Sequence, residues 1–273
     1  MRISKQRKKT TLAQQGRYLL ICMLSMMLFF LAGSMIILNR TQRQVYEQLE
    51  EISKLYTDEL DNRFLRISRN LFSTVMDSSN PDSDFWKYMD LMEKDQYEEY
   101  VITQLRKKYV SAAWDFGTDY NVFLYTKKDK SLYQLSISSD GFYAIDPYLQ
   151  EALKCRINSL SQQTYAVKKK WAVMQQGDEV YMLKVAQSQG VGLGCYVNLK
   201  TILEPFSKLS LGKSGYVSLV DQNGKNIVTV TEKGIVRDSS KLDTGNYTFR
   251  QELSQSPFEI RIKISWTGVL NLM

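Results

Sequence analysis

The chain contains no histidine, only four prolines and only three cysteines among its 273 residues. Without histidine these residues cannot form a Ser-His-Asp triad, a His-ligated zinc site or a phosphohistidine. The scarcity of proline, together with only fourteen glycines, excludes collagen-like and proline-rich chains. Cys22, Cys155 and Cys195 have no C-x-x-C spacing, so they indicate neither a metal knuckle nor a thioredoxin-type site. We therefore expect no metal and no cofactor.

Acidic residues are missing from the N-terminal segment, and this explains the net charge of +7. Residues 1–38 contain six basic residues and no acidic one. Of the 36 basic residues, 30 therefore lie in the rest of the chain, where they nearly balance the 29 acidic ones. No basic surface extends over a whole domain, so we expect no nucleic-acid partner.

Charge is also absent from residues 18–38, a run of 21 mostly apolar residues. A helix of this length spans about 31 Å, which is enough to cross the hydrocarbon core of a bilayer. The basic residues before it should stay in the cytoplasm, with the bulk of the chain outside. A cleaved signal peptide is the alternative, but its apolar region would be shorter and end in a small-residue site. The Leu31-Ala32-Gly33-Ser34 segment is instead followed by four more apolar residues. We therefore expect a single-pass anchor in the cell membrane.

Glycine and proline are absent from residues 39–76, where apolar residues recur every three or four positions. This spacing predicts one long helix with an apolar stripe. The stripe consists of Val45, Leu49, Ile52, Tyr56, Leu60, Phe64, Ile67, Leu71 and Val75. It either packs on its own domain or forms the seam of a homodimer, since the heptad pattern is not strict.

A turn is expected at residues 77–82, and a second helix, interrupted or amphipathic, is expected over residues 83–109. After it the apolar pattern changes to period two. Further helices are expected at residues 147–160 and 199–209, the latter capped by Asn198. The expected strands are residues 120–125, 131–138, 165–174, 179–186, 194–197, 215–221, 225–230, 247–253 and 258–265. Helices followed by antiparallel sheets indicate an α+β fold.

Two groups of motifs carry a family resemblance. The first is the hairpin GYVSLVDQNGKNIV at residues 215–228. The second comprises Trp171, the hairpin turn at Gly177, and the segments YML at 181–183 and YVNL at 196–199. With the anchor and the long helix, they resemble the tandem PAS-like domains of bacterial extracytoplasmic double-Cache sensors. The resemblance implies a basic tail (1–17), an anchor (18–38), long helices with a membrane-distal domain (39–210), a smaller membrane-proximal domain (211–265) and the start of a truncated second span (266–273).

Within that group, the chain is similar to the sensor regions of two-component sensor histidine kinases. The resemblance implies the input half of such a kinase, without enzymatic activity of its own, because no phosphoacceptor histidine or Gly-rich ATP-binding box occurs in these residues. Two alternatives remain open. The output is that of a chemoreceptor or a diguanylate cyclase, or the chain is an anchored envelope interaction protein that transmits no signal.

PAS-like sensors bind small molecules between the sheet and a covering loop, where tyrosine and tryptophan combine apolar rings with hydrogen-bonding groups. The candidates for ligand binding are Tyr125, Tyr133, Tyr143, Asp146, Trp171 and Tyr181. The alternative for the aromatic residues is ordinary core packing, and for Asp146 it is initiation of the helix. The Arg-Trp-Tyr motif by which one double-Cache subgroup binds amino acids cannot be aligned here, so amino-acid binding is not supported. The ligand is an unidentified small molecule or a partner protein.

Two further motifs have open or structural interpretations. Cys155 and Cys195 either form a disulfide or are buried free thiols. The glycines at positions 190, 192 and 194 precede a strand, whereas a dinucleotide-binding loop opens a helix, so we expect a flexible β-connection.

Overall fold

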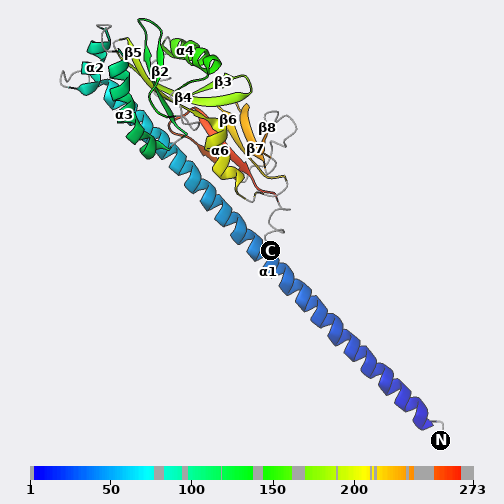
Figure 1. The fold of residues 1–273 in the computed structure, drawn as a ribbon. Helices are drawn as coiled ribbons and strands as arrows, with labels where there is room; N and C mark the ends of the chain where they lie inside the picture. Colours follow the sequence, from blue (N-terminus) through cyan, green and yellow to red (C-terminus); the bar gives the residue numbers. More distant parts are fainter. Residues whose placement is uncertain are drawn as a thin grey trace. The chain divides into compact units, whose positions relative to one another are not determined.

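The computed structural model describes residues 3–76, 83–93, 98–117, 119–137, 144–161, 170–188, 190–209, 211, 214–231, 234–236 and 249–265. The chain divides into two units, Met1–Leu49 and Glu50–Met273. Helix α1, Ile3–Met76, contributes residues to both. The fold is α+β, with a long apolar helix and two antiparallel sheets (Figure 1).

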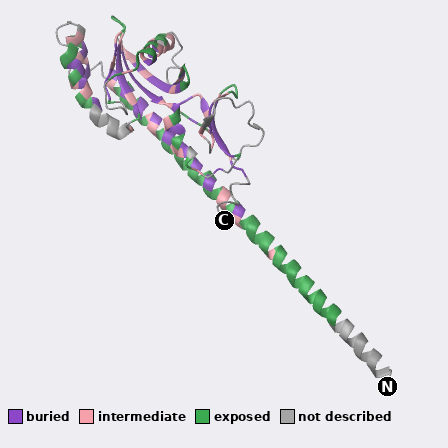
Figure 2. Ribbon diagram, turned by 45° about the vertical axis from the view of Figure 1, so that its right-hand side comes forward, coloured by how far each residue is buried: buried purple, intermediate pink, exposed green. Residues whose placement is uncertain are grey.

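The first unit consists of the N-terminal part of α1. Part of this helix is long and apolar enough to cross a membrane. Its large apolar side chains, such as Phe29 and Phe30, are exposed in the structure (Figure 2). Lipid is the solvent in which an exposed apolar helix of this length is stable, because the helix satisfies its backbone polar groups internally.

The first sheet of the second unit has the strand order β2-β1-β5-β4-β3, and each pair of neighbouring strands is antiparallel. The strands are β1 (Asn121–Thr126), β2 (Leu132–Gln134), β3 (Ala172–Gln176), β4 (Glu179–Ser188) and β5 (Val191–Asn198). Helix α4, Pro147–Ser161, packs on one face through Leu149, Leu153 and Ile157. The C-terminal part of α1 lies on the other face (Figure 1). The sheet is therefore buried on both sides.

The second sheet has the order β8-β7-β6-β10-β9 and is also antiparallel. Its strands are β6 (Tyr216–Asp221), β7 (Asn226–Thr231), β8 (Gly234–Val236), β9 (Phe249–Glu252) and β10 (Phe258–Lys263). Helix α6, Leu199–Ser207, connects the two sheets in sequence. Asn198 caps this helix as expected, because its Oδ1 accepts a hydrogen bond of 2.8 Å from Lys200 N.

Helix α1 buries the C-terminal part of the expected stripe within the chain itself. Leu60, Phe64, Ile67, Leu71 and Val75 are buried, which favours packing on its own domain over a dimer seam for this part.

Between Leu49 and Leu60, which are both buried as expected, the expected stripe is wrong by one position. Ile52 and Tyr56 are 39% and 40% exposed, whereas the neighbouring Ser53 and Thr57 are fully buried. From Leu49 to Leu60 the expected stripe has steps of 3, 4 and 4 residues and the buried one has steps of 4, 4 and 3, so helical periodicity fits both and tertiary packing selects the small polar residues.

Other boundaries differ from the expected ones. The region expected as an interrupted or amphipathic helix over residues 83–109 contains two helices, α2 (Asp84–Glu93) and α3 (Glu98–Phe116), and α3 ends seven residues later than expected. Strand β2 ends at Gln134, and β8 was not anticipated. Strand β3 begins at Ala172; the expected positions 165–169 lie outside the described residues.

Two of the three glycines lie in a strand, whereas Gly190 lies in the turn before it, with a φ of 82°. Gly192 and Gly194 lie in β5. A Cβ atom on Gly194 would overlap the ring of Phe123, so the glycine allows this aromatic side chain to lie across the neighbouring strand. Both cysteines considered for a disulfide are free, Cys155 exposed and Cys195 buried.

Candidate functional site

Alternation along β1 divides its side chains between the two faces of the first sheet. Phe123 and Tyr125 belong to the core that includes Leu153 and Ile157 of α4. We call this side of the sheet the α4 face. Pairing with β5 places Gly194 and Gly192 opposite these two aromatic residues, which leaves room for their rings.

Asp146 begins the helix that covers this face. Its Oδ1 accepts hydrogen bonds from Tyr148 N at 2.9 Å and from Leu149 N at 3.1 Å. Pro147 follows at the first helical position, where its fixed φ suits the helix. The structure therefore gives Asp146 the helix-initiating role, with its carboxylate at the edge of the α4 face.

Tyrosine hydroxyls on the α4 face form hydrogen bonds with amide side chains. Tyr125 OH donates to Asn158 Oδ1 of α4 at 3.1 Å, which ties the helix to the sheet. Tyr196 OH donates to Gln134 Oε1 at 3.1 Å, and Gln134 Nε2 donates to Asn121 Oδ1 at 3.2 Å. This face thus combines aromatic walls with polar tips.

Tyr181 is the half-buried member of this group. Its ring lies 6.0 Å from that of Tyr196 in an edge-to-face arrangement. Burial, followed by the negative charges of Glu179 and Asp146, raises the pKa of Tyr181. Burial also raises the pKa of Tyr196. Both hydroxyls therefore remain neutral at physiological pH, so this part of the face offers hydrogen bonds and no charge.

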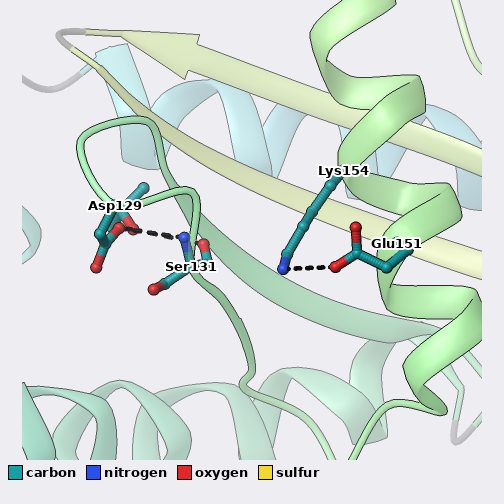
Figure 3. Close-up of polar contacts among 5 residues, drawn as sticks. Asp129, Ser131, Glu151 and Lys154 are labelled. Atoms are coloured by element: carbon teal, nitrogen blue, oxygen red, sulfur yellow. Dashed lines mark hydrogen bonds and ion pairs between the residues drawn. The ribbon is translucent and has the colours of Figure 1, made fainter.

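Charged groups occur near this face at the turn between β1 and β2 and on α4 (Figure 3). Asp129 Oδ1 accepts from Ser131 N at 3.1 Å and from Thr126 Oγ1. Burial alone would raise the pKa of Asp129, but these hydrogen bonds outweigh it and lower the pKa. Lys154 Nζ donates to Glu151 Oε1 at 2.9 Å. The Asp129 carboxylate therefore stabilises the turn to which it belongs, and the Lys154 ammonium on α4 is paired with Glu151.

Two of the expected ligand-binding residues lie on the opposite face. Trp171 is 1% exposed, and its indole Nε1 donates to Ser68 Oγ at 3.0 Å and to Phe64 O at 3.3 Å, both on α1. Tyr133 OH donates to Glu98 Oε1 of α3 at 2.6 Å. Burial and this hydrogen bond raise the pKa of Tyr133 to about 12.

The structure therefore brings Tyr125, Tyr181 and Asp146 to one face and directs Trp171 and Tyr133 toward the helices on the other. Tyr143 lies outside the described residues.

The sequence did not single out Asn158, Tyr196 and Gln134, although they supply most of the polar partners on the α4 face. The period-two pattern of β5 was a signal for Tyr196. Nothing local distinguishes Asn158 from other polar residues on a helix. Within the described part of the chain, no group of three or more histidine, cysteine or acidic residues is placed to hold a metal ion.

No family model matches the chain, and no curated protein matches it. Similar solved structures are sensory domains of the chemoreceptor Tlp3 from Campylobacter jejuni. The ligand-binding domain with L-valine is 14% identical, with a TM-score of 0.37, and the similarity covers 80% of this chain and 97% of that one. The sensory domain (CcmL) is 16% identical, with a TM-score of 0.34 and coverage of 80% and 98%. Its isoleucine-bound form is 15% identical, with a TM-score of 0.34 and coverage of 80% and 97%. TM-scores below 0.5 do not establish a shared fold.

Proposed function

We propose that the second unit is the extracytoplasmic sensor of a membrane-anchored receptor and that its α4 face binds a small molecule. The observation that supports this is the group formed by Tyr125, Asn158, Tyr181 and Tyr196, where neutral hydrogen-bonding tips lie among aromatic rings. Small-molecule sites in proteins have this composition, with mostly apolar walls and few polar groups that orient the ligand.

The position of α1 supports a signalling role. Its residues 60–75 pack in the second unit, on the sheet face away from α4, and the same helix contains the apolar run at residues 18–38. A ligand that binds one arrangement of α4 and the sheet more tightly than another shifts the population of the two. Because α1 packs on that sheet, such a shift acts on the helix that carries the anchor.

We further propose that the two sheets are tandem PAS-like domains, within residues 39–210 and 211–265, with the N-terminus in the cytoplasm. The output is that of a histidine kinase, a chemoreceptor or a diguanylate cyclase, which share this kind of input. An anchored interaction protein without output is the remaining alternative, and it predicts that no small molecule stabilises the chain.

Thermal unfolding of the full chain in lipid nanodiscs tests the binding. The panel consists of small uncharged molecules with hydrogen-bonding groups, and amino acids, short carboxylic acids and primary amines are included as charged comparators. A ligand present at 100 times its Kd stabilises the folded state by about 2.7 kcal/mol. For a domain of this size that amount raises Tm by roughly 5–10 °C.

Variants on the two faces make the test specific. Tyr125→Phe and Tyr181→Phe each remove a hydroxyl from the α4 face and should reduce the ligand-induced shift in Tm. Tyr133→Phe removes a hydroxyl from the opposite face and is the matched control, so its shift should equal that of the wild type. The proposal fails if no compound raises Tm, or if Tyr133→Phe weakens binding as much as the other two.

A further inference from the structure

The turn between β9 and β10 is bonded to α1 by one carboxylate. Asp61 Oδ2 accepts from Ser254 N at 3.2 Å and from Ser254 Oγ at 2.6 Å, and its Oδ1 accepts from Gln255 N at 3.1 Å. One helical turn earlier, Asp58 Oδ1 accepts from Gln251 Nε2 of β9 at 2.6 Å. Hydrogen bonds to a carboxylate are stronger than neutral ones, so this turn of the second sheet is fixed to α1.

Trp171 connects the same turn to the first sheet. Its backbone N–H donates to Gln255 O at 2.8 Å, and its indole donates to Ser68 Oγ of α1. Its ring lies 4.5 Å from that of Phe64. Trp171 immediately precedes β3, whose Met174 belongs to the core under α4.

These bonds form a closed arrangement. Asp61, Phe64 and Ser68 follow each other by three and four positions, so they lie on one face of α1. The Asp61 carboxylate accepts hydrogen bonds from the turn, and Phe64 O and Ser68 Oγ accept from the Trp171 indole. The backbone N–H of Trp171 in turn donates to Gln255 O of the turn. A displacement of any one of the three elements therefore strains its bonds to the other two.

We propose that Trp171, Asp61 and the turn at residues 253–257 form a coupling junction, which passes movements of the first sheet to the second sheet and to α1. This inference rests on the proposed function, because it assigns the route by which events at the α4 face reach the anchored helix. Trp171 acts as a positioning residue and does not contact the ligand.

Hydrogen–deuterium exchange on the full chain in lipid nanodiscs tests the junction without a ligand. Ile157→Ala, at a fully buried position in α4, perturbs the α4 face. The readout is the exchange rate of the Ser254 and Gln255 amides, which donate to Asp61. Ile157→Ala should accelerate this exchange roughly three- to tenfold, the range expected for weakening one net hydrogen bond.

Trp171→Phe separates coupling from packing, since phenylalanine keeps a ring against Phe64 but loses the indole N–H. In that background, Ile157→Ala should still accelerate exchange in α4 and β3, but the two turn amides should respond less than in the wild type, because only the backbone bond from position 171 to Gln255 remains. Trp86→Phe is the matched control, because Trp86 Nε1 has no hydrogen-bond partner among the described residues, and it should preserve the response.

Ser68→Ala removes the side-chain acceptor of the indole and should also suppress the response, while Ser73→Ala on the exposed side of α1 should not. This pair supplies the test if Trp171→Phe does not fold. The junction is refuted if Ile157→Ala alone leaves the exchange rates of the two turn amides unchanged. It is also refuted if Ile157→Ala accelerates their exchange as much in the Trp171→Phe or Ser68→Ala background as in the wild-type background. Failure of the ligand panel would refute the proposed function but leave these exchange rates unaffected, so the two failures are distinguishable.

Discussion

Replacement of Lys184 by methionine should stabilise the chain at neutral pH. Lys184 lies in β4, pairs with Cys195 of β5 and is 7% exposed. Burial lowers its pKa from 10.5 to about 8. Methionine has a similar length and an unbranched, adaptable side chain, so it fills the same space without a charge.

The magnitude follows from the two pKa values. At about 1.36 kcal/mol for each pH unit between them, the charged form costs up to about 3 kcal/mol in the folded state. Partial solvent access reduces this to about 2 kcal/mol. Because the folded-state pKa is the lower one, the unfolded chain binds more protons between pH 8 and 10.5, and stability rises with pH across that window. The cost is fully present below pH 8.

Thermal unfolding of the full chain in nanodiscs at pH 7 and pH 10 measures the effect. Lys184→Met should gain about 2 kcal/mol at pH 7, and most of this gain should disappear at pH 10. Lys200→Met, at an exposed position in α6, is the control for loss of a positive charge and should change stability little at either pH. A gain independent of pH, or a loss at pH 7, would refute the reasoning, because the ammonium would then be stabilised in place.

Two other predictions concern orientation and packing. A membrane-impermeant maleimide should label the exposed Cys155 in intact cells but not the buried Cys195. The control variant Cys155→Ser should not be labelled. Labelling of Cys155 only after lysis would contradict the orientation with the second unit outside the cell. Gly194→Ala should lower the free energy of unfolding by about 1–3 kcal/mol, because the added methyl group overlaps Phe123, and chemical denaturation measures this loss. Gly192→Ala, whose Cβ would have its nearest neighbour at 3.3 Å, should cost less; equal losses would show that the ring does not limit this position.

Features with local causes were predictable from the sequence. The absence of glycine and proline at residues 39–76 predicted the continuous helix, which is confirmed. The Asn223-Gly224 pair predicted the hairpin of β6 and β7, where Gly224 has a φ of 79°. The cap at Asn198 also depends only on neighbouring residues. In each case the chemistry that determines the structure lies within a few positions of the residue concerned.

Features that depend on register and on distant partners were not predictable. Tyr133 and Tyr125 both lie in strands, yet they face different helices, because β1 and β2 pair Leu124 with Tyr133 and Tyr125 with Leu132. The contact of Trp171 with Ser68 joins residues 103 positions apart, and no local pattern encodes it. The shift of the α1 stripe between Leu49 and Leu60 has a similar origin, because Ser53 and Thr57 are buried by tertiary packing that an apolar pattern does not reveal.

Hydrogen–deuterium exchange with a stabilising compound from the panel tests the central claim most directly. The full chain in nanodiscs is compared with and without the compound, and protection is mapped along the sequence. Binding at the α4 face predicts slower exchange in α4 and in the strands that carry Tyr125 and Tyr181, and a larger protection there than in α3. Protection confined to α3 and α1, or no protection in α4, would contradict the account.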